Sequence, residues 1–147
     1  MMTKRERVEI AMHSHKKGNN CGQSVLLAFQ DLTGLTEEQC LGIATGFGGG
    51  MRCGSICGAL SGAIAVLGTQ YPATDGVSKK RSVGLTKGMV DRFRDQFGYL
   101  NCRELLAVKD IHGTPIAEEL MHGDHCGTMI GTAVELLCDY LDELKEA

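Results

Sequence analysis

The sequence contains no Cys-x-x-Cys pair, although seven of its 147 residues are cysteine. Without that spacing, the thioredoxin-type redox motif, zinc ribbons and c-type haem attachment have no support. Cys53 and Cys57 are separated by three residues, a looser spacing that is typical of no particular site. The single glycine-rich run lacks both the lysine of a phosphate-binding loop and a preceding strand, so we do not expect nucleotide binding.

The sequence also lacks a long apolar run, a signal peptide and a concentration of basic residues. No apolar stretch reaches the roughly 18–20 residues that span a bilayer, and the charged N-terminus has no apolar core of the signal-peptide kind. The net charge is −3, so a nucleic-acid partner is not expected. We therefore expect a cytoplasmic protein without a membrane partner, whose thiols stay reduced. In that compartment, metal binding or redox chemistry explains the cysteines better than a disulfide framework does.

The chain shows no internal repeat and no convincing strand, and its apolar residues recur at helical spacing. In residues 79–97, for example, Val83, Val90, Phe93 and Phe97 fall on one side of a predicted helix. We predict a single all-α domain over residues 1–147, a compact bundle of about five to seven short helices. The predicted helices span residues 3–17, 21–29, 36–45, 57–68, 79–97, 102–108 and 126–144. Predicted connections are a turn at 31–35, a polar stretch at 72–77, and a loop at 110–123 with one helical turn at 116–120.

The stretch from Gly46 to Ala63 joins a run of glycines to the start of a predicted helix. Glycine is unfavourable inside a helix or strand, so the run predicts a loop that delivers Cys57 to a helix N-terminus. Free N–H groups and the positive end of the helix dipole favour a thiolate there, which makes Cys57 a candidate reactive or metal-ligating residue. A tight turn with a small buried cysteine is the alternative. Gly58 and Gly62 share a bare helix face, where a second backbone could pack, as in a homodimer.

Four cysteines fall in the first turn of four different predicted helices, each next to a candidate capping residue. These are Cys21, Cys57, Cys102 and Cys126. Each dipole is expected to lower the pKa of its thiol. Thiolates are the ligands of soft metals and of iron–sulfur clusters, and thiols of low pKa also suit disulfide exchange.

The other cysteines and two histidines fit this pattern less well. Cys40 and Cys138 lie within predicted helices and are interpreted as packing residues, whereas Cys53 lies in the glycine loop. His122 and His125 precede Cys126 closely, so they could join a mixed Cys/His zinc site.

A larger set of motifs is spread over the chain: Asn20-Cys21 with Gln23-Ser24-Val25, Gly46 to Met51, Cys57-Gly58-Ala59 with Gly62-Ala63, Phe97-Gly98 with Cys102 to Leu106, and Cys126. Together these motifs resemble the C_GCAxxG_C_C family, which is named for a redox activity. The resemblance extends from about residue 8 to the C-terminal helix, and the family's four recurrent cysteines match Cys21, Cys57, Cys102 and Cys126. Cys40, Cys53 and Cys138 lie outside the family pattern. A similar domain in split-Soret cytochromes carries an iron–sulfur centre, which implies cluster binding here. The absence of a Cys-x-x-Cys-His motif means that haem does not carry over.

The leading hypothesis is that the four cysteines ligate an iron–sulfur cluster for electron transfer with a redox partner protein. The backbone N–H groups of Gly48, Gly49 and Gly50 could then bind the cluster's sulfides. A second hypothesis is a metal-free thiol–disulfide protein that uses Cys57 and Cys21, with Cys57 as the attacking thiolate. A third is a structural zinc module. An oxidoreductase and an electron carrier are both compatible with these residues.

Overall fold

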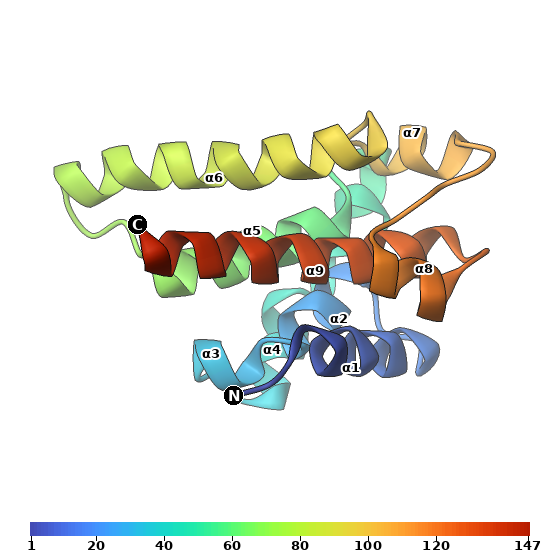
Figure 1. The fold of residues 1–147 in the computed structure, drawn as a ribbon, viewed down its shortest axis with the longest axis horizontal. Helices are drawn as coiled ribbons and strands as arrows, with labels where there is room; N and C mark the ends of the chain where they lie inside the picture. The colour runs from blue at the N-terminus through green and yellow to red at the C-terminus, as the bar shows by residue number, and fades with distance from the viewer.

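The chain is built almost entirely from helices (Figure 1). In a computed structural model covering residues 1–147, there are nine α-helices and no strand. The α-helices are α1 (Lys4–Lys16), α2 (Cys21–Leu27), α3 (Gln30–Thr33), α4 (Glu37–Ile43), α5 (Gly58–Gln70), α6 (Gly76–Phe97), α7 (Cys102–Ala107), α8 (Pro115–Met121) and α9 (His125–Glu146). Two short irregular helices, η1 (Thr45–Phe47) and η2 (Gly50–Gly54), lie between α4 and α5. The predicted all-α class is therefore confirmed.

The helical segments are more numerous and less uniform than the sequence predicts. The predicted turn at 31–35 contains α3, which ends at Gly34 in the left-handed region. Helix α6 begins at Gly76 rather than at residue 79, because Asp75 forms a capping box with Ser78. Helices α6 and α9 each contain 22 residues, so the bundle is not made of short helices alone. No helix combines the length and the apolar character needed to cross a bilayer.

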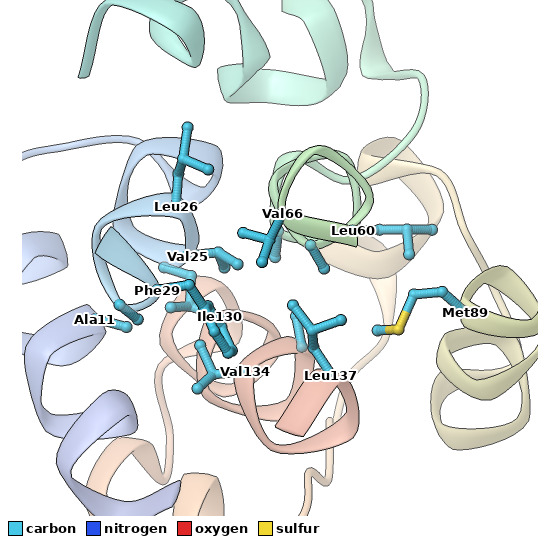
Figure 2. Packing of buried hydrophobic residues seen from close by; sticks show 14 of the residues in the cluster. Ala11, Val25, Leu26, Phe29, Leu60, Val66, Met89, Ile130, Val134 and Leu137 are labelled. Carbon is cyan, nitrogen blue, oxygen red and sulfur yellow. The ribbon is translucent and has the colours of Figure 1, made fainter. Parts of the chain in front are cut away.

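Helix α9 lies at the centre of the core. Its buried residues include Ile130, Val134 and Leu137, which recur at helical spacing and face the neighbouring helices. Figure 2 shows these three side chains gathered with Val25 and Phe29. Because α9 packs against α1, α2, α5, α6 and α8, its first turn is held in a fixed position relative to the other helices.

Helix α6 is much less buried than the sequence pattern predicts. Only Met89 and Phe93 are buried among its residues, and Val83, which was expected on the apolar face, is 64% exposed. The reason is visible in Figure 1, where the first turns of α6 extend past the end of α5 and the C-terminus of α9. The expected apolar face therefore meets the core only from Leu85 onward.

Glycines bring α2 and α5 into close contact. A Cβ atom added at Gly62 would lie 2.8 Å from the Gly22 carbonyl oxygen, and one added at Gly58 would lie 2.6 Å from the Phe47 carbonyl oxygen. The bare face of α5 therefore packs within the same chain, which removes the sequence-based reason to expect a homodimer. The same contact places Cys21 beside the start of α5, since its Cβ lies 3.4 Å from the Cβ position of Gly58.

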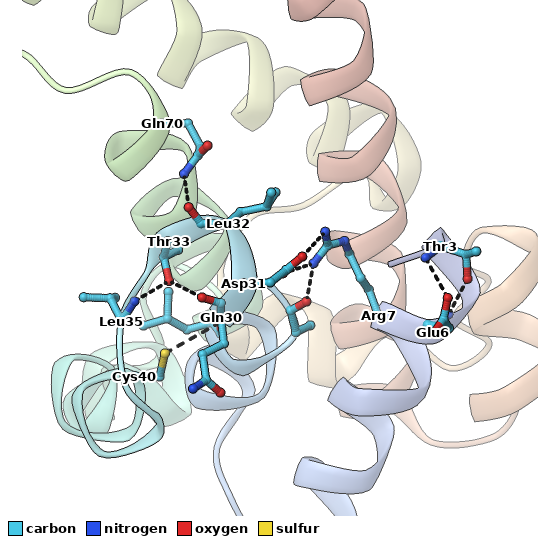
Figure 3. Close-up of polar contacts among 12 residues, drawn as sticks. Thr3, Glu6, Arg7, Gln30, Asp31, Leu32, Thr33, Leu35, Cys40 and Gln70 are labelled. Atoms are coloured by element: carbon cyan, nitrogen blue, oxygen red, sulfur yellow. Dashed lines mark hydrogen bonds and ion pairs between the residues drawn. The ribbon is translucent and has the colours of Figure 1, made fainter. Parts of the chain in front are cut away.

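An ion pair between Arg7 and Asp31 holds the N-terminal helix against the rest of the bundle, away from Cys21 (Figure 3). The guanidinium of Arg7 donates to the Asp31 carboxylate at 2.6 and 3.0 Å and to the Ala28 carbonyl oxygen at 2.8 Å. Arg7 is only 3% exposed, so these three bonds satisfy a buried charge. They connect α1 to α3 through Asp31 and to the C-terminal end of α2 through Ala28.

Candidate redox centre

The four candidate cysteines lie at helix starts. Cys21 and Cys102 are the first residues of α2 and α7, and Cys126 is the second residue of α9. Cys57 lies one position earlier than predicted, because it is the residue immediately before α5 rather than part of its first turn. Asn20 caps α2, because its side-chain oxygen accepts a hydrogen bond from the Gln23 backbone N–H at 2.8 Å. The Gln23 side-chain oxygen in turn accepts from the Asn20 backbone N–H, which completes a capping box.

Cys21 and Cys126 form the most strongly interacting pair. A hydrogen bond from the Cys21 thiol lowers the pKa of Cys126 and raises the pKa of Cys21. The imidazoles of His15 and His125 lower the pKa of Cys126 further, whereas burial and the Asp124 carboxylate oppose the lowering. Cys126 therefore loses its proton more easily than Cys21, and the thiolate of the pair forms on Cys126.

Cys57 and Cys102 are positioned by the one β-bridge in the molecule, between Ile56 and Asn101. The Cys57 N–H donates to the Leu100 carbonyl oxygen at 2.8 Å, and the Cys102 N–H donates to the Ser55 carbonyl oxygen at 2.7 Å. In an antiparallel pair, the residues next to a bridge all project to the face opposite the bridged side chains. Cys57 and Cys102 therefore project from the same face.

All four thiols influence one another electrostatically. Negative charge on Cys57, Cys126 or Cys102 raises the pKa of Cys21, and charge on Cys102 or Cys126 raises the pKa of Cys57. The structure thus brings these four cysteines into one region from segments far apart in the chain. Cys138 instead has charged neighbours at the far side of α9, namely Arg7, Lys4, Asp139 and Asp142. The Cys40 thiol lies 4.0 Å from the Leu26 carbonyl oxygen (Figure 3).

The expectation that every helix dipole lowers the pKa of its thiol is wrong for three of the four cysteines. Burial raises the pKa of Cys57 to about 11, even though the N–H groups of Ala59 and Leu60 hydrogen-bond its sulfur and favour the thiolate. Burial also raises the pKa of Cys102. The cost of removing the charge from water exceeds the stabilisation at the helix start. Cys57 is therefore protonated near neutral pH, and Cys126 is the readier nucleophile.

The glycine loop forms an unusual left-handed turn. Gly49, Gly50, Met51 and Arg52 have φ values of 62°, 61°, 60° and 60°. A Cβ at Gly50 would lie 2.3 Å from the Ser55 carbonyl oxygen, so only glycine fits there. At Gly48, a Cβ would lie 2.9 Å from the Asn20 Cβ.

The same loop connects two of the cysteines. Asn20, which caps the helix of Cys21, donates its side-chain amide to the carbonyl oxygens of Ala44 and Thr45. At the other end of the loop, the Ser55 N–H donates to the Gly50 carbonyl oxygen, two residues before Cys57. The glycine loop therefore lies between the cap of α2 and the segment that leads into α5, which carry Cys21 and Cys57.

The two histidines near Cys126 do not form a zinc site with it. His125 contacts the Val108 carbonyl oxygen, and His122 lies 3.1 Å from the Glu118 carboxylate with its side chain 75% exposed. No group of three or more His, Cys, Asp or Glu side chains is placed to hold a metal ion, so the four cysteines are not arranged around one point as a four-thiolate metal site would require.

Sequence reasoning missed several neighbours of the four cysteines. Met129 contacts Cys57, with the two sulfur atoms 3.8 Å apart. Met129 follows Cys126 by three residues, so their shared helix face could have revealed it. His15 of α1 lies 2.9 Å from Asp124, the residue that caps α9. No local sequence signal predicts that contact, because it joins the first helix to the last.

Comparison with known proteins adds one finding. Residues 19–140 match the family described as "Putative redox-active protein (C_GCAxxG_C_C)". No curated protein and no solved structure matches the chain.

Proposed function

Because the chain belongs to the C_GCAxxG_C_C family of redox-active proteins, we propose that its redox centre is formed by four cysteines that hold an iron–sulfur cluster for electron transfer. The proposed ligands are Cys21, Cys57, Cys102 and Cys126. The observation that carries the proposal is the mutual influence of four thiols delivered by four separate helices. Disulfide exchange requires only two thiols, so a site that gathers four is better explained by a ligand set.

The four cysteines are arranged as two pairs, and this arrangement favours one kind of metal group over another. A single zinc ion needs four ligands around one point, and no such group is present. In a two-iron cluster each iron takes two cysteines, so two neighbouring pairs suffice. The pairs Cys21–Cys126 and Cys57–Cys102 match that requirement in number and in donor chemistry. An iron–sulfur cluster held there would accept and donate one electron at a time.

The protein's own residues would tune such a centre. Cys57 is buried, and the N–H groups of Ala59 and Leu60 stabilise its sulfur in the charged form. Hydrogen bonds to ligand sulfurs and exclusion of water are two means by which proteins set reduction potential. Gly48, Gly49 and Gly50 contribute in this proposal through their backbone N–H groups, which would bind the cluster's sulfides. Reduced thiols fit a cytoplasmic electron carrier.

The test is to purify the protein without oxygen and measure its iron, acid-labile sulfide, visible absorption and electron paramagnetic resonance after dithionite reduction. We expect iron and sulfide in equal amounts, a brown colour that bleaches on reduction, and a paramagnetic signal in the reduced state. In Cys57→Ser these signals should disappear, whereas Cys40→Ala should retain them. Colourless protein without iron and sulfide, also after anaerobic reconstitution, would contradict the proposal.

A second candidate function is favoured by the lowered pKa of Cys126. The Cys126 thiolate would attack a disulfide of a substrate protein, forming a mixed disulfide and releasing one substrate thiolate, which takes up a proton. Cys21 would then lose its proton and attack the Cys126 sulfur, releasing the second substrate thiol. The substrate gains two electrons and two protons, and the protein is left with a Cys21–Cys126 disulfide.

This candidate assigns the attack to Cys126 instead of Cys57. It predicts that metal-free protein exposed to oxidised glutathione loses two thiols and that peptide mapping finds them joined as Cys21–Cys126. Cys126→Ser should abolish that reaction, and Cys102→Ser should leave it intact. Equal reaction of the Cys126→Ser and wild-type proteins would rule it out.

A further inference from the structure

One side of the proposed redox centre is open to solvent. The first turns of α2, α5 and α9, next to Cys21, Cys57 and Cys126, contain no exposed residue. The first turn of α7, by contrast, exposes Arg103 and Glu104 immediately after Cys102. Cys21, Cys102 and Cys126 are all partly exposed, but only Cys102 is followed by exposed residues in the first turn of its helix.

Apolar side chains are exposed around this opening. Met51 of η2 is 51% exposed and Leu106 of α7 is 50% exposed, and they are among the few large apolar side chains that are exposed in the molecule. The two segments are in contact, because Arg103 donates to the Cys53 carbonyl oxygen at 3.2 Å. Leu106 follows Arg103 by one helical turn, so both lie on the face of α7 that adjoins η2.

The same surface carries two free positive charges. Arg52 and Arg103 are exposed, and neither forms an ion pair with a carboxylate of the chain. Glu104 adds one exposed negative charge beside Arg103, so the surface carries two positive charges and one negative charge. The whole chain has a net charge of −3, so this excess of positive charge differs in sign from the protein as a whole. An acidic protein would be repelled by most of the molecule and attracted here.

Two residues of η2, Met51 and Arg52, have an unfavourable backbone conformation. Met51 and Arg52 are the only non-glycine residues with positive φ, at 60° each. Bulky residues in the left-handed region are strained, and such strain is concentrated at binding and catalytic sites. Glycine would remove the strain but also the side chains.

We propose that Met51, Arg52, Arg103 and Leu106 form the docking surface for an acidic electron-transfer protein that exchanges electrons through Cys102. This inference rests on the proposed function and names the partner of the same centre. The two arginines would steer an approaching carboxylate-rich face, and Met51 and Leu106 would pack against its apolar centre. Small, weakly bound interfaces of this composition are typical of electron-transfer encounters.

The test is stopped-flow electron transfer from a reduced plant-type ferredoxin, which is acidic, to the oxidised holoprotein at several salt concentrations. The test variant is Arg52→Glu with Arg103→Glu. The control is Lys79→Glu with Lys80→Glu, the same change of charge at the start of α6, at the far end of the molecule (Figure 1). Dithionite reduction and iron content report separately on the centre, and a basic cytochrome c serves as a donor of opposite charge.

We expect the second-order rate with ferredoxin to fall as salt rises and to fall about tenfold in the double arginine variant at low salt. The lysine control should change by less than about twofold, and dithionite should reduce all variants equally. Transfer from ferredoxin that is absent, independent of salt, or equally slowed by the lysine control would overturn the docking surface while leaving the centre intact. A wild-type dimer that Arg52→Glu dissociates would overturn it in favour of a second copy as occupant. Failure of dithionite to reduce wild-type protein would instead reject the proposed function.

Discussion

Cys126 and Cys138 lie on the same helix and allow the two ends of the molecule to be compared. Cys126 begins α9, where Cys21 donates to it and lowers its pKa. Cys138 lies about 18 Å further along α9, at about 1.5 Å per residue, and burial raises its pKa to about 11. The same side chain on one helix therefore differs in chemistry because of its position and neighbours, and only one end of α9 is a candidate site.

The two ends are also held together differently. At the cysteine end, backbones approach closely through Gly22, Gly50 and Gly62, with no room for a Cβ. At the other end, side chains make the connections, as in the Arg7–Asp31 ion pair. The cysteine end should therefore tolerate small additions poorly, and the other end should respond mainly to loss of charge or volume.

The largest effect is expected for Gly50→Ala. Its Cβ would lie 2.3 Å from the Ser55 carbonyl oxygen and the φ of 61° is unfavourable for alanine, so the turn must change. We expect a loss of about 3 kcal/mol in the free energy of unfolding, measured by urea denaturation. The control is Gly68→Ala, where nothing lies within 4 Å of the new Cβ and helix propensity should add about 0.5–1 kcal/mol. If both variants had equal stability, the close packing of the turn would be refuted.

A smaller loss is expected when the ion pair at the other end is removed. Asp31→Asn leaves the buried Arg7 charge without its partner and should cost about 2 kcal/mol. Arg7 lowers the pKa of Asp31 from its usual 3.8, so the carboxylate's contribution is present above that pH and is lost as pH falls through the lowered pKa. Wild-type stability should thus decrease below about pH 4 more steeply than that of Asp31→Asn. Parallel pH profiles for the two proteins would disprove the contribution of this pair.

Truncation of a packing cysteine should cost still less. Cys40→Ala removes a fully buried thiol and should lower the free energy of unfolding by about 1 kcal/mol. Its redox behaviour should match wild type, since Cys40 lies outside the four interacting thiols. Calorimetry measures the first effect and dithionite titration the second. A changed titration would mean that the division of the cysteines into two groups is incorrect.

The smallest effect on stability is expected for Met51→Gly, which should raise rather than lower the free energy of unfolding. Met51 is half exposed and strained at a φ of 60°, so glycine should relieve about 1 kcal/mol of backbone strain. Greater flexibility of the unfolded chain should cancel part of this gain. Thermal unfolding should therefore show a small increase in stability, and a decrease of more than about 1 kcal/mol would show that the Met51 side chain packs more than its exposure indicates.

Local sequence patterns predicted the helices and the place of the cysteines at their starts. Asn20, Thr36 and Asp124 are recognisable capping residues, and all three accept the expected backbone N–H. Patterns of this kind depend on residues three or four positions apart, which a sequence displays directly. The buried part of α6 was harder to predict, because the part of an amphipathic helix that meets the core depends on where the neighbouring helices end.

Properties that depend on long-range contacts could not be predicted. The raised pKa of Cys57 follows from its burial beneath α9, and the lowered pKa of Cys126 requires Cys21 from the opposite end of the sequence. The left-handed residues Met51 and Arg52 lie in a turn that the Ser55 N–H closes by donating to the Gly50 carbonyl oxygen. The sequence identified the candidate residues, but the difference between them arises only from the tertiary structure.

The most direct test of the central claim is the iron and sulfide content of Cys102→Ser, compared with Cys138→Ala, in protein purified without oxygen. Cys102 belongs to the four interacting thiols but not to the Cys21–Cys126 pair. Its replacement therefore distinguishes a centre that needs all four cysteines from one that needs only Cys21 and Cys126. The account predicts that Cys138→Ala retains the iron, sulfide and visible absorption of wild type and that Cys102→Ser loses them. Retention of all three in Cys102→Ser, or their loss in Cys138→Ala, would contradict it.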